Sequence, residues 1–340
     1  ASEVRAVRER VGVMDVTAFT KVLVEGPGAY ALLDRLTANR MPQKVGSITL
    51  THMLNRRGRI ELETTIVRMA GDRFYLVCAA FFEQRLLDHL AAHRGETDVR
   101  VTALSDSWGA LALNGPRARD VLAGCTSARL DNTAFRWLSA QEIDVAGHRV
   151  WAFRMSYAGE LGWELHMPFD AMTDVYDALW QAGEAHGIAD YGSFAMNVLR
   201  MEKAFKGAGE LTNEVTLAEA DVLRFARRDK DYLGKDRTLN EDLLWVCAYL
   251  GIEADGEIDG HGGEAVLLNG EVVGSTASVV YSPTADRVLA FAYVRPGAAA
   301  PGTALEVVIH GQPRPAMVLA DPIYDPQSDK PRTDAVTEPV

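Results

Sequence analysis

The stretch TKVLVEGPGAYALLDRL, residues 20–36, contains the pattern that organises this chain. Thr20–Glu25 is typical of a strand, Gly26-Pro27 ends it, and Ala29–Leu36 places its leucines at helical spacing. Proline close to the start of a helix is a recognised N-terminal signal. The pattern returns in GALALNGPRARDVLA, residues 109–123, as a strand over Gly109–Asn114, a Gly-Pro turn and a helix over Arg117–Ala123. Two copies of a strand–Gly-Pro–helix unit predict an internal duplication of an α/β substructure.

The rest of the chain divides near residue 240. Before it, strand-like and helix-like segments alternate: strands at Ile60–Val67, Arg73–Cys78, Val150–Met155 and Gly162–Met167, helices at Phe81–His93, Ala171–His186 and Gly192–Phe205. After it, short apolar segments are separated by turn signals such as Asn269-Gly270, which predicts a small all-β barrel or sandwich. We therefore expect one domain over 1–240, a second over 241–330 and a polar tail over 331–340.

Composition excludes several classes of function. The chain has 340 residues and a net charge of −12, which argues against a nucleic-acid partner and against docking on anionic membrane lipid. No apolar run reaches the length of a membrane span, and three isolated cysteines suit a reducing cytoplasm, so we expect a cytoplasmic protein. No P-loop, early G-x-G-x-x-G, H-E-x-x-H motif or Cys/His ligand pair occurs, which leaves nucleotide, nicotinamide, flavin and metal sites in this chain unsupported.

One segment carries a family resemblance. MSYAGELGWEL, residues 155–165, closely resembles the Y-T-G-E-x-G-x-E motif of the aminomethyltransferase (glycine-cleavage T-protein) family. Other landmarks of that family follow in its order: Met53-Leu54-Asn55 with Gly58, Leu113–Pro116, Leu199–Lys203, Asn213–Ala220, Leu233-Gly234-Lys235, Tyr281-Ser282-Pro283 and Tyr324-Asp325-Pro326. The resemblance implies an α+β fold with a duplicated α/β folate-binding region and a small C-terminal β-barrel.

Within that family the chain most resembles the folate-binding half of dimethylglycine and sarcosine dehydrogenases, through residues 6–15 (AVRERVGVMD) and Glu202–Phe205. Those enzymes usually carry an FAD domain ahead of this half. The resemblance therefore implies a tetrahydrofolate site at the centre of three subdomains, no FAD site in this chain, and an FAD-containing subunit or removed segment as the flavoprotein partner.

The same resemblance singles out Glu63 as the catalytic candidate. On a strand, Glu61 and Glu63 point to one face and Leu62 to the other. The position of Glu63 matches a family carboxylate, often Asp, that faces the folate N10. A buried carboxylate there can stabilise positive charge and accept a proton as the folate amines capture a carbon. The alternative is a solvated strand glutamate.

Four further residues are candidates for folate binding. The family position of Glu164 bonds the pterin edge, where a carboxylate suits an N–H/NH2 face, and Tyr157 would stack on or bond the folate. An exposed glutamate and an ordinary half-buried tyrosine are the alternatives. Leu50 corresponds to a pterin-contacting aromatic of some members, and Tyr281 would approach from the barrel.

Three more residues carry expectations about the site or its surroundings. Met196 replaces an arginine that glycine-cleavage proteins often carry near the pterin, which points to a relative with another carbon donor. We interpret Arg200 as a structural ion-pair residue and His52 as a surface or packing histidine.

The leading hypothesis is a tetrahydrofolate-dependent one-carbon transferase in oxidative N-demethylation. Its substrate is a small methylated amine, or the derived iminium or formaldehyde, and its product is 5,10-methylenetetrahydrofolate. One alternative is direct demethylation of an O-, S- or N-methyl compound to 5-methyltetrahydrofolate. Another is a non-catalytic folate-binding module, although the K-G-C-Y-x-G-Q signature of such relatives is absent.

Overall fold

Two glycines, Gly26 and Gly115, mark the same place in two copies of one substructure. Each follows a strand, has a φ of +120° or +134°, and leaves a backbone carbonyl oxygen only 2.5 Å from where a Cβ would stand. Each also accepts a hydrogen bond from the third residue after it, at the start of a helix. Only glycine adopts this conformation readily, so the repeated Gly-Pro signal reflects a backbone requirement met twice. The predicted duplication is present in this computed structural model, which describes residues 1–239, 242–254, 256, 258 and 260–334.

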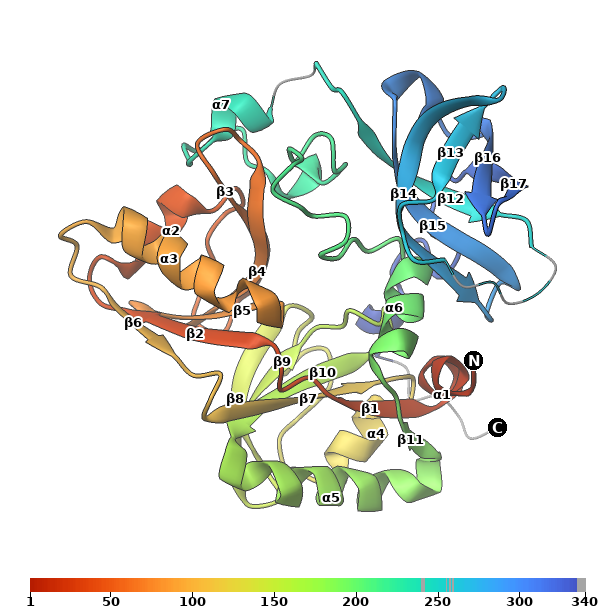
Figure 1. The fold of residues 1–340 in the computed structure, drawn as a ribbon. Coiled ribbons are helices and arrows are strands. Elements are labelled where there is room, and N and C mark those ends of the chain that lie inside the picture. Colours follow the sequence, from red (N-terminus) through yellow and green to blue (C-terminus); the bar gives the residue numbers. More distant parts are fainter. Residues whose placement is uncertain (240–241, 255, 257, 259, 335–340) are drawn as a thin grey trace.

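The first copy is a five-stranded sheet in the order β3-β4-β5-β2-β6. Its strands are β2 (Thr20–Glu25), β3 (Ile48–Leu54), β4 (Ile60–Ala70), β5 (Arg73–Cys78) and β6 (Arg100–Ala103), and its helices are α2 (Ala29–Leu36) and α3 (Glu83–Arg94). Both helices pack on one face of the sheet, where their leucines meet apolar residues such as Leu62 and Phe74 (Figure 1).

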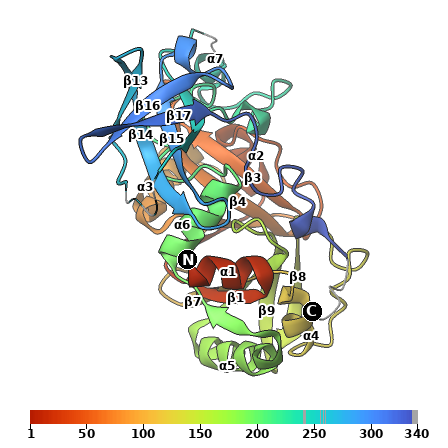
Figure 2. The ribbon, with the colours of Figure 1, turned by 90° about the vertical axis from the view of Figure 1, so that its right-hand side faces the viewer.

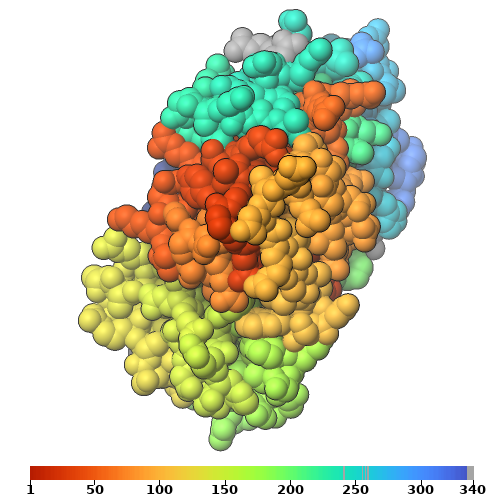
Figure 3. Space-filling view, turned by 90° about the vertical axis from the view of Figure 1, so that its left-hand side faces the viewer, coloured from red at the N-terminus to blue at the C-terminus, as the bar shows by residue number. Residues whose placement is uncertain are grey.

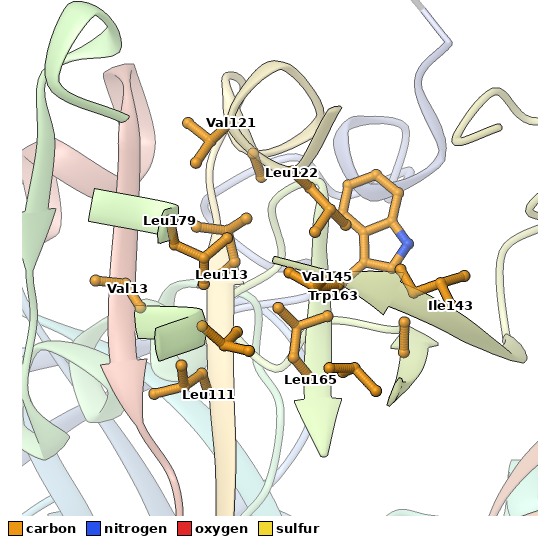
Figure 4. Packing of buried hydrophobic residues seen from close by; sticks show 14 of the residues in the cluster. Val13, Leu111, Leu113, Val121, Leu122, Ile143, Val145, Trp163, Leu165 and Leu179 are labelled. Atoms are coloured by element: carbon orange, nitrogen blue, oxygen red, sulfur yellow. The ribbon is translucent and has the colours of Figure 1, made fainter. Parts of the chain in front are cut away.

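The second copy is a six-stranded sheet in the order β11-β1-β7-β10-β9-β8. Its strands are β1 (Val11–Asp15), β7 (Trp108–Asn114), β8 (Ser139–Val145), β9 (His148–Arg154), β10 (Gly162–Pro168) and β11 (Ile188–Asp190), and α4 (Ala118–Ala123) and α5 (Met172–Gly183) cover it. Figure 4 shows the resulting core, in which Trp163 and Leu165 of β10 point toward the residues of α4 and α5. Because side chains alternate along a strand, Glu164 and His166 point to the opposite face.

The opposite faces of the two sheets pack against each other. Tyr75 and Val77 of the first sheet meet Trp151 and Phe153 of the second in one apolar cluster. The helices α2, α3, α4 and α5 therefore lie on the outer faces of the two sheets, and the inner faces of the sheets contact each other.

The remainder of the chain adds a third lobe. Helix α6 (Ser193–Glu202) is followed by an irregular segment that contains α7 (Lys235–Thr238), and then by a closed barrel in the order β12-β15-β14-β13-β16-β17. The barrel strands are β12 (Val246–Ile252), β13 (Ala265–Leu268), β14 (Glu271–Ser282), β15 (Arg287–Val294), β16 (Ala304–Ile309) and β17 (Gln312–Val318). The expected barrel is confirmed, and Figure 3 shows the first copy lying between the segment near residue 230 and the second copy.

A buried cation ties the lobes together. Arg8, near the end of α1 (Ser2–Glu9), bonds Glu202 of α6 at 2.7 Å and Glu160 of the loop before β10 at 2.9 Å. Its guanidinium carbon lies 3.8 Å from the ring centre of Tyr324, beyond the barrel. Helix α1 lies beside β1, close to the marked N-terminus (Figure 2).

As far as Asp334, the residues after the barrel pack against the rest of the protein and form no tail. Lys203 pairs with Asp325 at 3.0 Å, and Asn132 donates a hydrogen bond to the carbonyl of Arg332 at 2.8 Å. Pro331 is buried. The tail expected over 331–340 is thus packed against the protein as far as Asp334. The rest of that range lies outside the described residues.

Candidate functional site

A cavity of about 440 Å³ opens where the two sheets, α6 and the segment 205–225 come together. This volume lies in the range of small-molecule sites. Its apolar lining includes Met14, Val16, Phe19, Ile48, Leu50, Val77, Phe82, Trp137, Met155, Met196, Phe205 and Phe225, and its polar lining includes Glu63, Asn114, Ser156, Tyr157, Glu164, Lys206 and Arg224. Four of the five site residues expected from the sequence, namely Leu50, Glu63, Tyr157 and Glu164, are in this one wall.

Glu63 reaches the cavity from β4, and its side chain is 27% exposed. It stands opposite His52 of β3 in the antiparallel register, and Glu63 Oε1 lies 3.2 Å from His52 Nε2. Leu62 packs on the other face, among the helices, as the alternation predicts. The carboxylate is therefore held at the cavity wall and is not a freely solvated group.

Of the two alternatives expected for His52, a surface or a packing histidine, the structure has the packing one, because the side chain is fully buried. Its ring centre lies 5.6 Å from that of Phe225, which lines the cavity. Neither ring nitrogen makes a well-aligned hydrogen bond with any of the residues described. Its closeness to Glu63 follows from strand register, which the sequence alone did not reveal.

Glu164 enters the cavity from β10, with its side chain 14% exposed. Its Oε2 lies 3.3 Å from Nε2 of the fully buried His166. Tyr157, in the loop before β10, donates its hydroxyl hydrogen bond to the carbonyl of Lys206 at 3.0 Å, and its ring stacks at 6.2 Å on Phe205. Burial raises the pKa of the Tyr157 phenol, so the hydroxyl remains a donor.

Tyr281 is not brought together with these four residues. It belongs to β14, it packs against the apolar core of the barrel, and its hydroxyl bonds the Asp286 carboxylate. In the described part of the chain, the barrel contributes no side chain to the cavity wall. Tyr281 therefore does not line the site where it was expected to contact folate.

Several polar residues of the wall were not predicted from the sequence. Asn114 donates a hydrogen bond to the Tyr191 hydroxyl and accepts one from Ser156, both at 2.8 Å. Its position just before Gly115, at the end of a repeated strand, was the available signal. Arg224 lines the cavity and is exposed, which places it at the mouth. It lies in an irregular segment, where no helical or strand periodicity marks it in the sequence.

The interpretation of Arg200 as an ion-pair residue is confirmed. Its Nη1 lies 2.8 Å from the buried Glu210 carboxylate, and its Nη2 donates a hydrogen bond to Ser278 at 3.1 Å. It thus joins α6 to the barrel.

Across the described residues, no group of three or more His, Cys, Asp or Glu side chains is arranged to hold a metal ion. Within the same ranges, no helix is long and apolar enough to cross a membrane.

Comparisons with known proteins agree with this arrangement. Residues 1–230 match the GCVT N-terminal domain and residues 248–325 match the glycine cleavage T-protein C-terminal barrel domain. The chain is 36% identical to mitochondrial dimethylglycine dehydrogenase of Mus musculus over 95% of its own length and 38% of the relative's, so it spans about two fifths of that protein. It is 32% identical to an aminomethyltransferase of Saccharopolyspora erythraea, over 95% of this chain and 89% of the relative.

A solved structure shows the same fold. The glycine cleavage system aminomethyltransferase T of Bartonella henselae superposes with a TM-score of 0.86 at 23% identity, covering 96% of this chain and 89% of that one.

Proposed function

This chain belongs to the aminomethyltransferase (glycine-cleavage T-protein) family of folate-dependent transferases, and from that premise we propose that it captures a methyl-derived carbon on tetrahydrofolate. The product is 5,10-methylenetetrahydrofolate. The carbon arrives at the oxidation level of formaldehyde, as the free aldehyde or an iminium, from a small N-methylated amine that a flavoprotein partner oxidises. The 36% identity to a dimethylglycine dehydrogenase, of which this chain spans only 38%, supports both the amine and the partner.

The cavity suits a reduced folate chemically. Glu164 offers carboxylate lone pairs that match the adjacent N–H and NH2 donors of a pterin edge. Aromatic walls at Phe205 and Phe225 suit its flat ring. Arg224 at the mouth is available for the glutamate carboxylate at the other end of the vitamin, because it makes no ion pair with any of the described residues. Its guanidinium carbon lies 4.9 Å from the centre of the Phe225 ring.

Tetrahydrofolate supplies two amine nitrogens that each form one bond to the carbon. In the overall change the two N–H hydrogens leave with the aldehyde oxygen as water or, when the carbon arrives as an iminium, with its nitrogen as the freed amine. Glu63 is the acceptor for a proton at this step, because it is a carboxylate at the wall of a largely apolar cavity. The same negative charge stabilises cationic character that develops on the carbon, and the apolar lining limits competing hydration.

The position of Glu63 is the observation that carries the proposal, and Glu63→Gln tests it. The amide keeps the shape but cannot take a proton. We expect tetrahydrofolate to bind within about threefold of wild type while turnover falls on the order of 10²-fold. Glu61→Gln is the matched control, since Glu61 lines a separate surface hollow and not the cavity.

Turnover is measured as methylene-folate formation at micromolar formaldehyde, with the uncatalysed condensation subtracted. An unchanged rate in Glu63→Gln would leave only a folate-binding module. Methyl-folate as the product would favour the direct demethylation route. Absence of tetrahydrofolate binding by the wild-type chain would remove the proposal altogether.

A further inference from the structure

Three polar side chains stand in line behind the cavity wall. Glu164 Oε2 lies 3.3 Å from His166 Nε2, and His166 Nδ1 lies 3.1 Å from the hydroxyl oxygen of Tyr75. Glu164 and His166 are on β10 of the second sheet, and Tyr75 is on β5 of the first. The line thus crosses the interface between the two copies.

The chemistry of the three groups fixes the direction of each hydrogen bond. A carboxylate only accepts, so His166 Nε2 must donate to Glu164. A neutral imidazole has a single N–H, so Nδ1 is then an acceptor and the Tyr75 hydroxyl donates to it. Burial lowers the pKa of His166, against the opposing effect of Glu164, and burial raises the pKa of Tyr75, so the neutral forms are favoured for both.

Packing prevents the imidazole from turning. The Phe153 ring lies 4.5 Å from it at an interplanar angle of 34°, and the Tyr75 ring meets it edge-on at 5.5 Å. Trp151 holds Tyr75 from another side at 5.2 Å. His166 therefore presents its N–H to Glu164 from one fixed direction.

The Glu164 carboxylate has no other hydrogen-bond partner among the described residues. Its remaining lone pairs face the cavity, where a ligand would find them. An exposed glutamate would sample several rotamers and lose entropy on binding, whereas one tethered to a rigid ring loses less.

We propose that His166 is a positioning residue, which orients the Glu164 carboxylate toward the N–H donors of the bound pterin, and that Tyr75 fixes the tautomer that makes this possible. The inference rests on the proposed function for the identity of the ligand. Neither residue touches the cavity itself: the lining includes Glu164 but not His166 or Tyr75.

Three variants separate this role from simple packing. His166→Phe keeps a ring but removes both polar contacts, whereas His166→Gln retains an amide N–H toward Glu164 and a carbonyl toward Tyr75. Tyr75→Phe removes one hydroxyl and leaves the ring. The matched control is Tyr249→Phe, a buried tyrosine whose hydroxyl bonds the carbonyl of Met201 at 2.8 Å.

Binding is measured by calorimetry with tetrahydrofolate and with its analogue in which a methyl group replaces the pterin 2-amino group. We expect His166→Phe to weaken tetrahydrofolate binding about tenfold or more, with His166→Gln within about threefold of wild type. The loss for the analogue should be smaller, because one donor that depends on Glu164 is already missing. Tyr75→Phe should lose several-fold, and Tyr249→Phe nothing.

A folded His166→Phe that binds tetrahydrofolate within twofold of wild type would overturn the inference, as would equal losses for both ligands. Nitrogen NMR of histidine-labelled wild-type protein gives a test that needs neither ligand nor variant. It should show His166 protonated at Nε2 and bare at Nδ1, and the opposite tautomer would also overturn the inference. Wild-type protein that shows the expected tautomer but binds no tetrahydrofolate would instead refute the proposed function.

Discussion

Replacing Arg8 with methionine removes a buried cation while keeping most of the side-chain volume. The guanidinium donates two hydrogen bonds to Glu202, at 2.9 and 2.7 Å, and one to Glu160 at 2.9 Å. Two more go to the carbonyls of Ala158 at 2.8 Å and Leu199 at 3.1 Å. In the Arg8→Met protein, both carboxylates stay buried without this partner.

The expected cost follows from that geometry. Removing one partner of a buried ion pair destabilises a protein by about 3–5 kcal/mol, because the remaining charge loses its compensation without regaining water. The side chains of Glu160 and Glu202 are 2% and 0% exposed, so the upper half of that range applies. Domains are stable by only about 5–15 kcal/mol, and the variant should lose a large part of its stability.

The cost should also depend on pH. Burial raises the pKa of Glu160 even beside Arg8, and without Arg8 it should rise further. A carboxyl with a raised pKa binds more protons in the native than in the unfolded state, so its contribution to stability falls as the pH rises. The Arg8→Met deficit should therefore be smaller at pH 5 than at pH 8.

Urea unfolding followed by circular dichroism measures both effects. Arg5→Met is the control, since Arg5 lies on the same helix but is exposed, and it should stay within about 0.5 kcal/mol of wild type. Adding Glu202→Gln to Arg8→Met should recover part of the loss. A loss below about 1 kcal/mol, or one that grows toward acid pH, would refute the reasoning.

Two further predictions concern the repeated turn and the cavity wall. Gly26→Ala and Gly115→Ala should each lower the free energy of unfolding by at least about 2 kcal/mol, because the new Cβ would lie 2.5 Å from a carbonyl oxygen. Gly71→Ala is the control, since nothing lies within 4 Å of its Cβ position, and it should change that free energy by less than about 0.5 kcal/mol. Thermal or urea unfolding measures both, and equal effects at all three positions would contradict the prediction. Cys78 lines the cavity, and burial raises the pKa of its thiol to about 12. At pH 8 iodoacetamide should therefore modify the less buried Cys125 first, as read by peptide mass spectrometry. Earlier labelling of Cys78 would contradict this expectation.

Local patterns predicted the elements of the fold well. The strand expected over Thr20–Glu25 and the helix over Ala29–Leu36 have those same bounds in the structure, and the second Gly-Pro unit differs by one residue at each start. These segments are decided by alternation, helical spacing and a backbone need for glycine, all of which lie within a few residues of one another.

The site was predictable on one strand and within one recognised motif. Strand alternation around Glu63 and the motif that contains Tyr157 and Glu164 both led to residues that line the cavity. His166 shares the face of Glu164, but its partner Tyr75 comes from the other sheet, and no local pattern brings them together. Arg224 lies in an irregular segment and was missed, and Tyr281 was assigned from motif order alone.

The distance along the chain between Arg8 and its partners also constrains biosynthesis. Glu160 comes 152 positions after Arg8, and Glu202 comes 194 positions after it. A ribosome therefore makes α1 long before it makes the acidic groups that neutralise Arg8. The strands of the first sheet lie between Arg8 and Glu160 in the sequence, so that sheet can form while α1 still lacks its partners. During cotranslational folding, α1 thus docks after the sheet that follows it in the chain.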